Sequence, residues 1–294
     1  MTSLKKLALG TVQWGINYGI ANHSGMVTPN VVTDILAEAS TLGIEVLDTA
    51  AAYGKSEEVL GLNNLESFKV VTKTPIFNQS EISDADVKHL NLAFKNSLIS
   101  LRCKKVYGLL VHDVKNLLAP GGEALIQSML ELKEAGFIEK IGVSVYDSHD
   151  LDAVLKKFSM DLVQVPLNIL DQRMLLSGHL DMLKDNGIEI HSRSVFLQGL
   201  LLLPINKVPK FFDPISPTLN TWHEICRERG LSAAEACLAF VKNVAQIDRV
   251  LVGIDGLSHL RSNANDFMRN VDFDAKGLSC ASEIFINPSL WRVK

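Results

Sequence analysis

The chain has 294 residues, of which 47% are hydrophobic and 21% are charged, and its formal net charge is −4. This balance is typical of a globular protein with a sizeable core, and the length fits one α/β barrel as well as two ordinary domains. The weakly acidic charge and the absence of a run of Lys or Arg argue against binding to nucleic acid or to an anionic membrane.

The cysteines and the amino-terminal segment bear on metal binding and location. The four cysteines are scattered without the spacing of a metal site, so we expect reduced thiols and no bound metal. The apolar stretch at the amino terminus is too short for a signal peptide. No stretch of the chain approaches the roughly 18 apolar residues of a membrane span. A cytoplasmic protein is therefore expected.

Eight short apolar runs, rich in Val, Ile and Leu, follow one another along the chain. Most of them lack the alternation of a half-exposed sheet, which is typical of parallel strands that are covered on both faces. We expect strands at residues 6–11, 43–49, 68–74, 106–112, 138–145, 162–166, 187–195 and 249–254.

Helix-like segments of fitting length lie between these runs. The first, at 28–43, has Thr28 as its cap, Pro29 at the first helical position and Gly43 as its stop. Four more amphipathic segments follow, at 83–101, 121–136, 148–158 and 231–243.

Strand–helix units repeated in this way predict a single-domain α/β protein, a (β/α)₈ TIM barrel over residues 1–294. A doubly wound sheet would usually carry a glycine-rich phosphate loop after its first strand. Neither G-x-G-x-x-G nor G-x-x-x-x-G-K occurs in the chain, and no linker or domain boundary stands out.

Polar residues end several of the expected strands, where the chemistry of such a barrel lies. Asp48 ends the second strand with Tyr53 in its loop, Lys73 ends the third, and His112 ends the fourth. Taken singly, each has an ordinary explanation as a turn cap, a packed ring, a surface-reaching lysine or a half-buried histidine. Because adjacent strands bring their ends into one mouth, together they indicate an active site.

The four residue types also suit proton donation to a carbonyl oxygen. A phenol is a weak acid, with a pKa of about 10, but a nearby Lys73 ammonium would favour its phenolate. Asp48 would hold Lys73 in place and charged, and a neutral His112 would orient a carbonyl group by hydrogen bonding. Such a set can protonate an oxygen on which negative charge develops during hydride delivery.

The chain resembles the aldo-keto reductase superfamily over nearly its whole length, from "LALGT" to "LRSNAND". The resemblance is carried by "LDTAAAYGKSE", "VVTKT", "LLVHD", "GFIEKIGVSVY", "QVPLNILDQR" and "VLVGIDGLSHLRSNAND". It implies NAD(P)H-dependent reduction of an aldehyde or ketone to an alcohol. It also implies a catalytic tetrad, with Tyr53 as the general acid, that comprises Asp48, Tyr53, Lys73 and His112.

The resemblance further implies an extended cofactor across the barrel mouth, with its nicotinamide amide held by Ser144 and Gln164. Val145 stands in place of the usual Asn after that serine. Arg193 matches the aromatic residue that commonly stacks on the nicotinamide, and it could stack, reach a phosphate or pair with a carboxylate. Further cofactor contacts are expected from Ser194, Gly199, Arg261 and Asn265.

The resemblance favours NADP(H) over NAD(H) as the cofactor. Family members often place a Lys-Ser pair at the 2′-phosphate, and this pair aligns with Asp255 and Gly256. A carboxylate should repel a 2′-phosphate, so the use of NAD(H) stays open.

The loops after the first and seventh strands bear on the substrate, a small-molecule carbonyl compound. Asn17, Tyr18 and His23 would suit a hydroxylated substrate, although surface solvation explains them nearly as well. The segment 201–220 is long, proline-marked and apolar, and suited to folding over the cofactor or the substrate. The stretches "TVQWGINYGIAN" and "RSVFLQGLLL" look similar to a bacterial subgroup associated with polysaccharide sugar metabolism, which favours a sugar-like carbonyl compound.

Two other kinds of protein stay open. One is an NADPH-binding regulatory or sensing subunit with little turnover, and the other is a Schiff-base lyase in which Lys73 attacks a carbonyl. The tail 285–294 could lie across the mouth or pack against the barrel. Nothing in the sequence predicts the oligomeric state.

Overall fold

Eight parallel strands close into a barrel in the order in which they occur in the chain. The computed structural model describes residues 4–22 and 24–291, and His23 lies outside this part. All eight expected strands are confirmed, each no longer than the run that predicted it: β1 (Leu7–Gly10), β2 (Val46–Asp48), β3 (Lys69–Lys73), β4 (Val106–Val111), β5 (Ile138–Ser144), β6 (Leu162–Pro166), β7 (Glu189–Arg193) and β8 (Arg249–Gly253).

The strands are apolar on both faces because both faces are buried. Inside the barrel a small cluster packs against itself, comprising Ala8, Val46, Val71, Leu110, Leu162 and Leu251. The alternate residues, such as Leu7, Leu9 and Leu47, belong to a larger core cluster that includes helix residues. The barrel interior is therefore filled by side chains, which explains why the strands do not alternate between apolar and polar residues.

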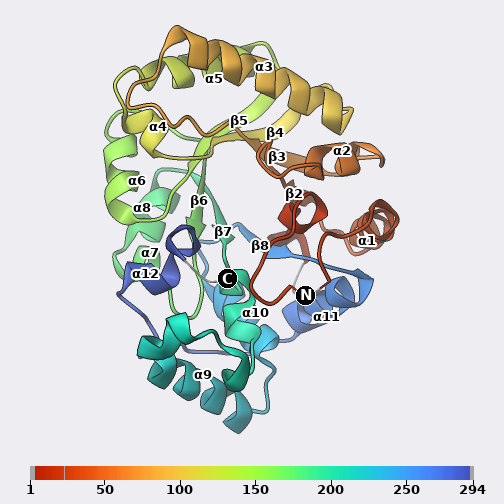
Figure 1. Cartoon of the computed structure of the whole chain (residues 1–294), viewed down its shortest axis with the longest axis vertical. Coiled ribbons are helices and arrows are strands. Elements are labelled where there is room, and N and C mark those ends of the chain that lie inside the picture. Colours follow the sequence, from red (N-terminus) through yellow and green to blue (C-terminus); the bar gives the residue numbers. More distant parts are fainter. Residues whose placement is uncertain (1–3, 23, 292–294) are drawn as a thin grey trace.

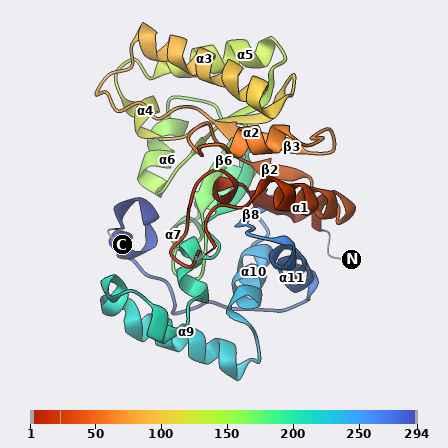
Figure 2. The ribbon, with the colours of Figure 1, turned by 45° about the vertical axis from the view of Figure 1, so that its right-hand side comes forward.

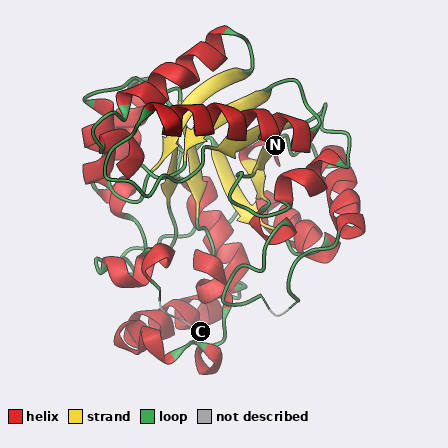
Figure 3. Cartoon of the chain, turned by 45° about the horizontal axis from the view of Figure 1, so that its top comes forward, coloured by secondary structure: helices red, strands yellow, loops and turns green. Residues whose placement is uncertain are grey.

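Helices surround the strands on the outside (Figures 1 and 3). The expected ones are confirmed as α1 (Pro29–Thr41), α3 (Asp84–Leu101), α5 (Glu123–Glu134), α6 (Ser148–Leu155) and α10 (Ala233–Asn243). The structure adds α2 (Ser56–Gly61), α4 (Lys115–Leu118), α7 (Arg173–Leu176), α8 (His179–Asp185), α9 (Ser216–Glu228), α11 (Leu257–Met268) and α12 (Glu283–Ile286). Within the described residues, no helix has the length and apolar character needed to cross a membrane.

Local sequence signals set the ends of these helices. Thr28 precedes α1 and Pro29 is its first residue, while Gly43 follows it with a φ of +74°, a conformation that glycine adopts without strain. At the start of α3 the backbone N–H of Ser83 donates to Asp86 Oδ2 at 2.9 Å. This contact satisfies a backbone donor that the helix itself leaves unpaired.

The segment 201–220 is more structured than a loop. It contains short 3₁₀ turns at Ile205–Lys207 and Lys210–Ile215, and α9 begins at Ser216. The carboxy-terminal segment packs against it, since the Trp291 ring lies 4.9 Å from that of Phe212. Figure 2 shows the course of the chain in this region. The described part of the tail thus lies against this segment, and residues 292–294 are outside the described part.

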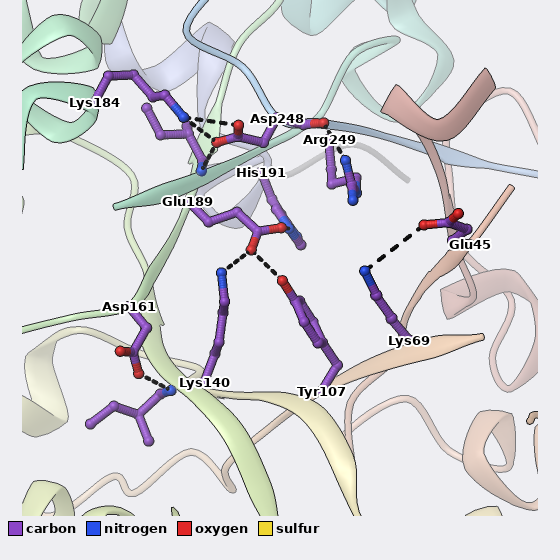
Figure 4. Close-up of polar contacts among 12 residues, drawn as sticks. Glu45, Lys69, Tyr107, Lys140, Asp161, Lys184, Glu189, His191, Asp248 and Arg249 are labelled. Carbon is purple, nitrogen blue, oxygen red and sulfur yellow. Dashed lines mark hydrogen bonds and ion pairs between the residues drawn. The ribbon is translucent and has the colours of Figure 1, made fainter. Parts of the chain in front are cut away.

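A polar cluster lies among the amino-terminal ends of the strands, at the end of the barrel opposite the expected active site. Figure 4 shows its side chains. Glu189 of β7 accepts hydrogen bonds from Tyr107 of β4, at 2.5 Å, from Lys140 of β5 and from the His191 ring. Burial alone would raise the pKa of the Glu189 carboxyl, but these three donors outweigh burial and hold it well below its usual range. The cluster therefore ties three strands together with a charged carboxylate.

Candidate active site

The carboxyl ends of the strands open onto a cavity of about 510 Å³. Asp48, Lys73 and His112 reach it from β2, β3 and the first position after β4, as expected from the place of each at a strand end. Tyr53 joins them from the turn after β2. The structure thus brings together all four residues that the sequence proposed for catalysis.

Lys73 and Asp48 form a buried ion pair in the floor of this cavity. The Lys73 ammonium donates to Asp48 Oδ1 at 2.6 Å and to the backbone carbonyl of Thr49 at 3.0 Å. Gln164 of β6 donates its side-chain amide to the other carboxylate oxygen at 2.8 Å. Burial alone would lower the pKa of Lys73, but Asp48 and Tyr53 outweigh it and raise that pKa. The ammonium therefore stays charged.

Tyr53 lies directly beside this ammonium, with Lys73 Nζ 5.1 Å from the centre of its ring. Gly54 follows at a φ of +56°, and a Cβ there would come within 2.5 Å of the Gly15 carbonyl oxygen, so the turn requires glycine. Burial raises the pKa of Tyr53, while the charge and hydrogen bond of Lys73 oppose this rise. Tyr53 is thus a protonated phenol at neutral pH whose deprotonated form Lys73 stabilises.

His112 completes the group. Its ring meets that of Tyr53 edge to face, with centroids 5.9 Å apart, and its backbone N–H donates to Thr74 Oγ1 at 3.2 Å. Burial, followed by the charge of Lys73, lowers the pKa of His112 to about 4. The imidazole is therefore neutral at physiological pH and can act as a hydrogen-bonding group without carrying a charge.

Five of the residues expected to contact the cofactor line the same cavity: Ser144, Gln164, Arg193, Ser194 and Gly199. The Arg193 guanidinium donates to Ser144 Oγ at 3.3 Å, to the Val145 carbonyl at 3.0 Å and to Ser194 Oγ at 3.2 Å. It also lies 4.0 Å from the centre of the Tyr146 ring.

The residues expected at the adenosine end lie differently. Of the described residues, Arg261 and Asn265 are not among those that line the cavity. Arg261 forms an exposed ion pair with Glu38 of α1 at 3.0 Å. Their role as cofactor contacts stays a prediction, because this placement alone does not test it.

Sequence reasoning missed several residues that line the cavity. On α11 these are His259, Ser262 and Asn263, whose spacing of three and four residues places them on one helix face. That periodicity could have grouped them, but it does not say which face of the helix turns to the mouth. Tyr146 was also missed, although its position two residues after Ser144 at the end of β5 was a usable signal.

Three buried polar atoms on the cavity wall have no hydrogen-bond partner among the described residues. They are Gln13 Oε1, His112 Nδ1 and Asp255 Oδ1. Because buried polar groups in proteins are normally hydrogen-bonded, these atoms fit a ligand that is rich in donors. A nicotinamide dinucleotide, with its amide and ribose hydroxyls, is a ligand of this kind.

The model of the Aldo/keto reductase family matches residues 6–278 of this chain. An uncharacterized oxidoreductase of Bacillus subtilis, YqkF, is 23% identical over 282 residues, which is 88% of this chain and 90% of that protein. The aldo-keto reductase YhdN of the same organism is 29% identical over 203 residues, covering 66% of this chain and 57% of its own length.

Solved structures share the fold. The aldo-keto reductase AKR11C1 from Bacillus halodurans, in its holo form, superposes with a TM-score of 0.71 at 20% identity, covering 90% of this chain and 87% of its own. A putative aldo-keto reductase from Pseudomonas aeruginosa gives 0.66 at 22% identity, covering 89% of each chain. At these identities the likeness shows the fold, and the family match shows membership. The chain belongs to the aldo/keto reductase family and is an NAD(P)H-dependent oxidoreductase that acts on carbonyl compounds.

Proposed function

We propose that this enzyme reduces an aldehyde or ketone to an alcohol, with Tyr53 as the general acid. The observation that carries the proposal is the buried Lys73–Asp48 pair, 2.6 Å apart, beside a protonated Tyr53 in the cavity. A buried charge pair is costly to maintain, and stability alone is a weak reason to keep one. Next to a phenol it has a chemical use, because it stabilises the phenolate left when the proton departs.

In this proposal each residue has a separate task. When bound, the cofactor supplies a hydride to the carbonyl carbon and is oxidised. Tyr53 gives its proton to the carbonyl oxygen as charge develops there, and Lys73 stabilises the remaining phenolate. Asp48 keeps Lys73 charged and in place, and Gln164 fixes the free oxygen of Asp48. His112, neutral beside Tyr53, orients the carbonyl group by hydrogen bonding.

For the cofactor we propose that Ser144 and Gln164 hold the nicotinamide amide, with Arg193, Ser194 and Gly199 next to it. At the adenosine end we propose Arg261 and Asn265. Family resemblance favours NADP(H), while Asp255, a cavity-lining carboxylate with an unpaired buried oxygen, argues for tolerance of NAD(H). The Asp255 carboxylate oxygen can accept hydrogen bonds from ribose hydroxyls, whereas it would repel a phosphate.

For the substrate we propose a sugar-like carbonyl compound. Tyr18 and Gln198 line the cavity and offer hydrogen-bonding groups to substrate hydroxyls. Burial raises the pKa of Tyr18 to about 12, so that its phenol stays neutral and can both donate and accept. His23 lies outside the described residues.

The test is a screen with NADPH or NADH and a panel of aldehydes, ketones and aldoses, with products identified by mass spectrometry. We expect one alcohol formed for each reduced cofactor consumed. Cofactor binding without consumption across the panel would contradict the proposal and would favour a sensing subunit. A borohydride-trapped substrate adduct on Lys73 would instead favour a Schiff-base lyase.

A further inference from the structure

A fixed positive charge lies beside the residues proposed to hold the nicotinamide. The Arg193 side chain is held by the two serine hydroxyls, the Val145 carbonyl and the face of the Tyr146 ring. Ser194 has a φ of +60°, an uncommon conformation for a residue other than glycine, and its carbonyl accepts from Asn168 at 3.1 Å. The guanidinium is therefore positioned by the backbone after β7 as well as by its own contacts.

This charge has no acidic partner in the part of the chain that the structure describes. None of the ion pairs found among residues 4–22 and 24–291 includes Arg193, and each of its hydrogen-bond acceptors is a neutral oxygen. Asp48, the carboxylate in the same cavity floor, is already bound by Lys73 and Gln164. A half-buried cation without a counter-ion exerts its field on whatever binds next to it.

The field of Arg193 reaches the reacting centre. Its nitrogen Nε lies 3.3 Å from Ser144 Oγ, so a nicotinamide amide held by Ser144 would place the ring close to the guanidinium. Burial dominates the pKa shifts of Tyr53 and His112, and the charge of Arg193 acts on both: it opposes the rise in the pKa of Tyr53 and adds to the fall in that of His112. Arg193 is thus close enough to act on a charge that changes during the reaction.

We propose that Arg193 makes the cavity bind the reduced cofactor in preference to the oxidised cofactor. This inference rests on the proposed function. The nicotinamide ring is neutral when reduced and positively charged when oxidised, whereas every other charge of the cofactor stays the same. A neighbouring cation therefore repels only the oxidised form, and at partly buried distances this repulsion corresponds to roughly a tenfold to hundredfold difference in affinity.

Equilibrium binding of both cofactor forms tests this directly, without turnover. The dissociation constants of NADPH, NADP⁺, NADH and NAD⁺ would be measured by titration calorimetry for the wild type, Arg193→Met and Arg193→Lys. We expect the ratio of the oxidised to the reduced dissociation constant to fall at least about tenfold in Arg193→Met. Arg193→Lys, which keeps the charge, should retain most of the wild-type ratio. If the methionine variant does not fold, Arg193→Gln removes the charge and keeps a hydrogen-bonding side chain.

The outcomes separate the two proposals. An unchanged ratio in the uncharged variant would overturn the role of Arg193 and leave the reductase proposal standing. Failure of the wild type to bind any of the four cofactor forms would overturn the proposed function, and this inference with it. An equal fall of the ratio in Arg193→Lys and Arg193→Met would show that the guanidinium shape, rather than its charge, sets the preference, which also contradicts the inference.

Discussion

Lys73 is held by contacts that tie two strands together and that also position it for the proposed chemistry. Its ammonium is almost fully buried and donates to Asp48 and to the Thr49 carbonyl, so strand β3 is tied to the end of β2. The sequence indicated this group because each member lies at or just after a strand end, where the barrel collects its side chains. The bond from Gln164 to Asp48 could not be predicted, because it depends on side-chain directions across the barrel mouth.

His112 should make the stability of the folded protein depend on pH. Its pKa is lowered to about 4 in the folded protein from 6.5, so between these values the unfolded chain binds more protons. Stability should therefore fall as the pH drops through this window, by about 2–3 kcal/mol from this residue. Urea unfolding at pH 7 and at pH 4.5 checks this. Between these two pH values, the free energy of unfolding should fall less in His112→Gln than in the wild type. Equal losses would mean that His112 is not buried in its neutral form.

The second prediction concerns Asp255. If it faces the adenosine ribose, Asp255→Lys should tighten NADPH binding about tenfold and weaken NADH binding, because a cation attracts the 2′-phosphate that a carboxylate repels. Asp266→Lys is a matched control, since it makes the same charge change on α11, where Asp266 is not among the cavity-lining residues. Fluorescence titration measures both affinities. No change in either would show that another residue selects the cofactor.

At the scale of elements, the strands were predictable and several helices were not. The apolar runs marked every strand because both faces of each strand are buried. The start of α9 was hidden in a proline-rich segment, although Pro217 stands in the first turn of that helix, where proline is tolerated. α4, α7 and α12 have four residues each, too few to show a helical period.

The pairing between β5 and β6 should not tolerate a side chain at Gly142. A Cβ at Gly142 would lie 1.9 Å from the Leu162 carbonyl oxygen, so the two strands approach too closely for any side chain there. Gly142→Ala should cost about 3 kcal/mol or more in the free energy of unfolding. Gly256→Ala, where a Cβ meets nothing within 4 Å, should cost about 1 kcal/mol or less. Chemical denaturation measures the free energy of unfolding of both variants. Similar losses in the two would contradict the observed β5–β6 register.

At the level of the whole molecule, we expect the two ends of the barrel to have different tasks. The polar cluster around Glu189 lies among the amino-terminal ends of the strands (Figure 4), and the residues proposed for catalysis lie at the carboxyl ends. Glu189→Gln should cost about 1–3 kcal/mol in stability, because Lys140 and His191 lose a charged acceptor. Its kcat/KM at a temperature well below unfolding should stay within about twofold of wild type. A large loss of turnover in the folded variant would mean that the two ends are coupled.

The proposed reaction depends on Tyr53 as the proton donor, and a single turnover of Tyr53→Phe tests this role. Enzyme preloaded with NADPH or NADH is mixed with an excess of a carbonyl substrate, and cofactor oxidation is followed by absorbance. We predict an unchanged cofactor dissociation constant and a rate of oxidation at least about a hundredfold lower than in wild type, because only the transition state needs the phenol proton. A rate close to that of the wild type would contradict the assignment of Tyr53.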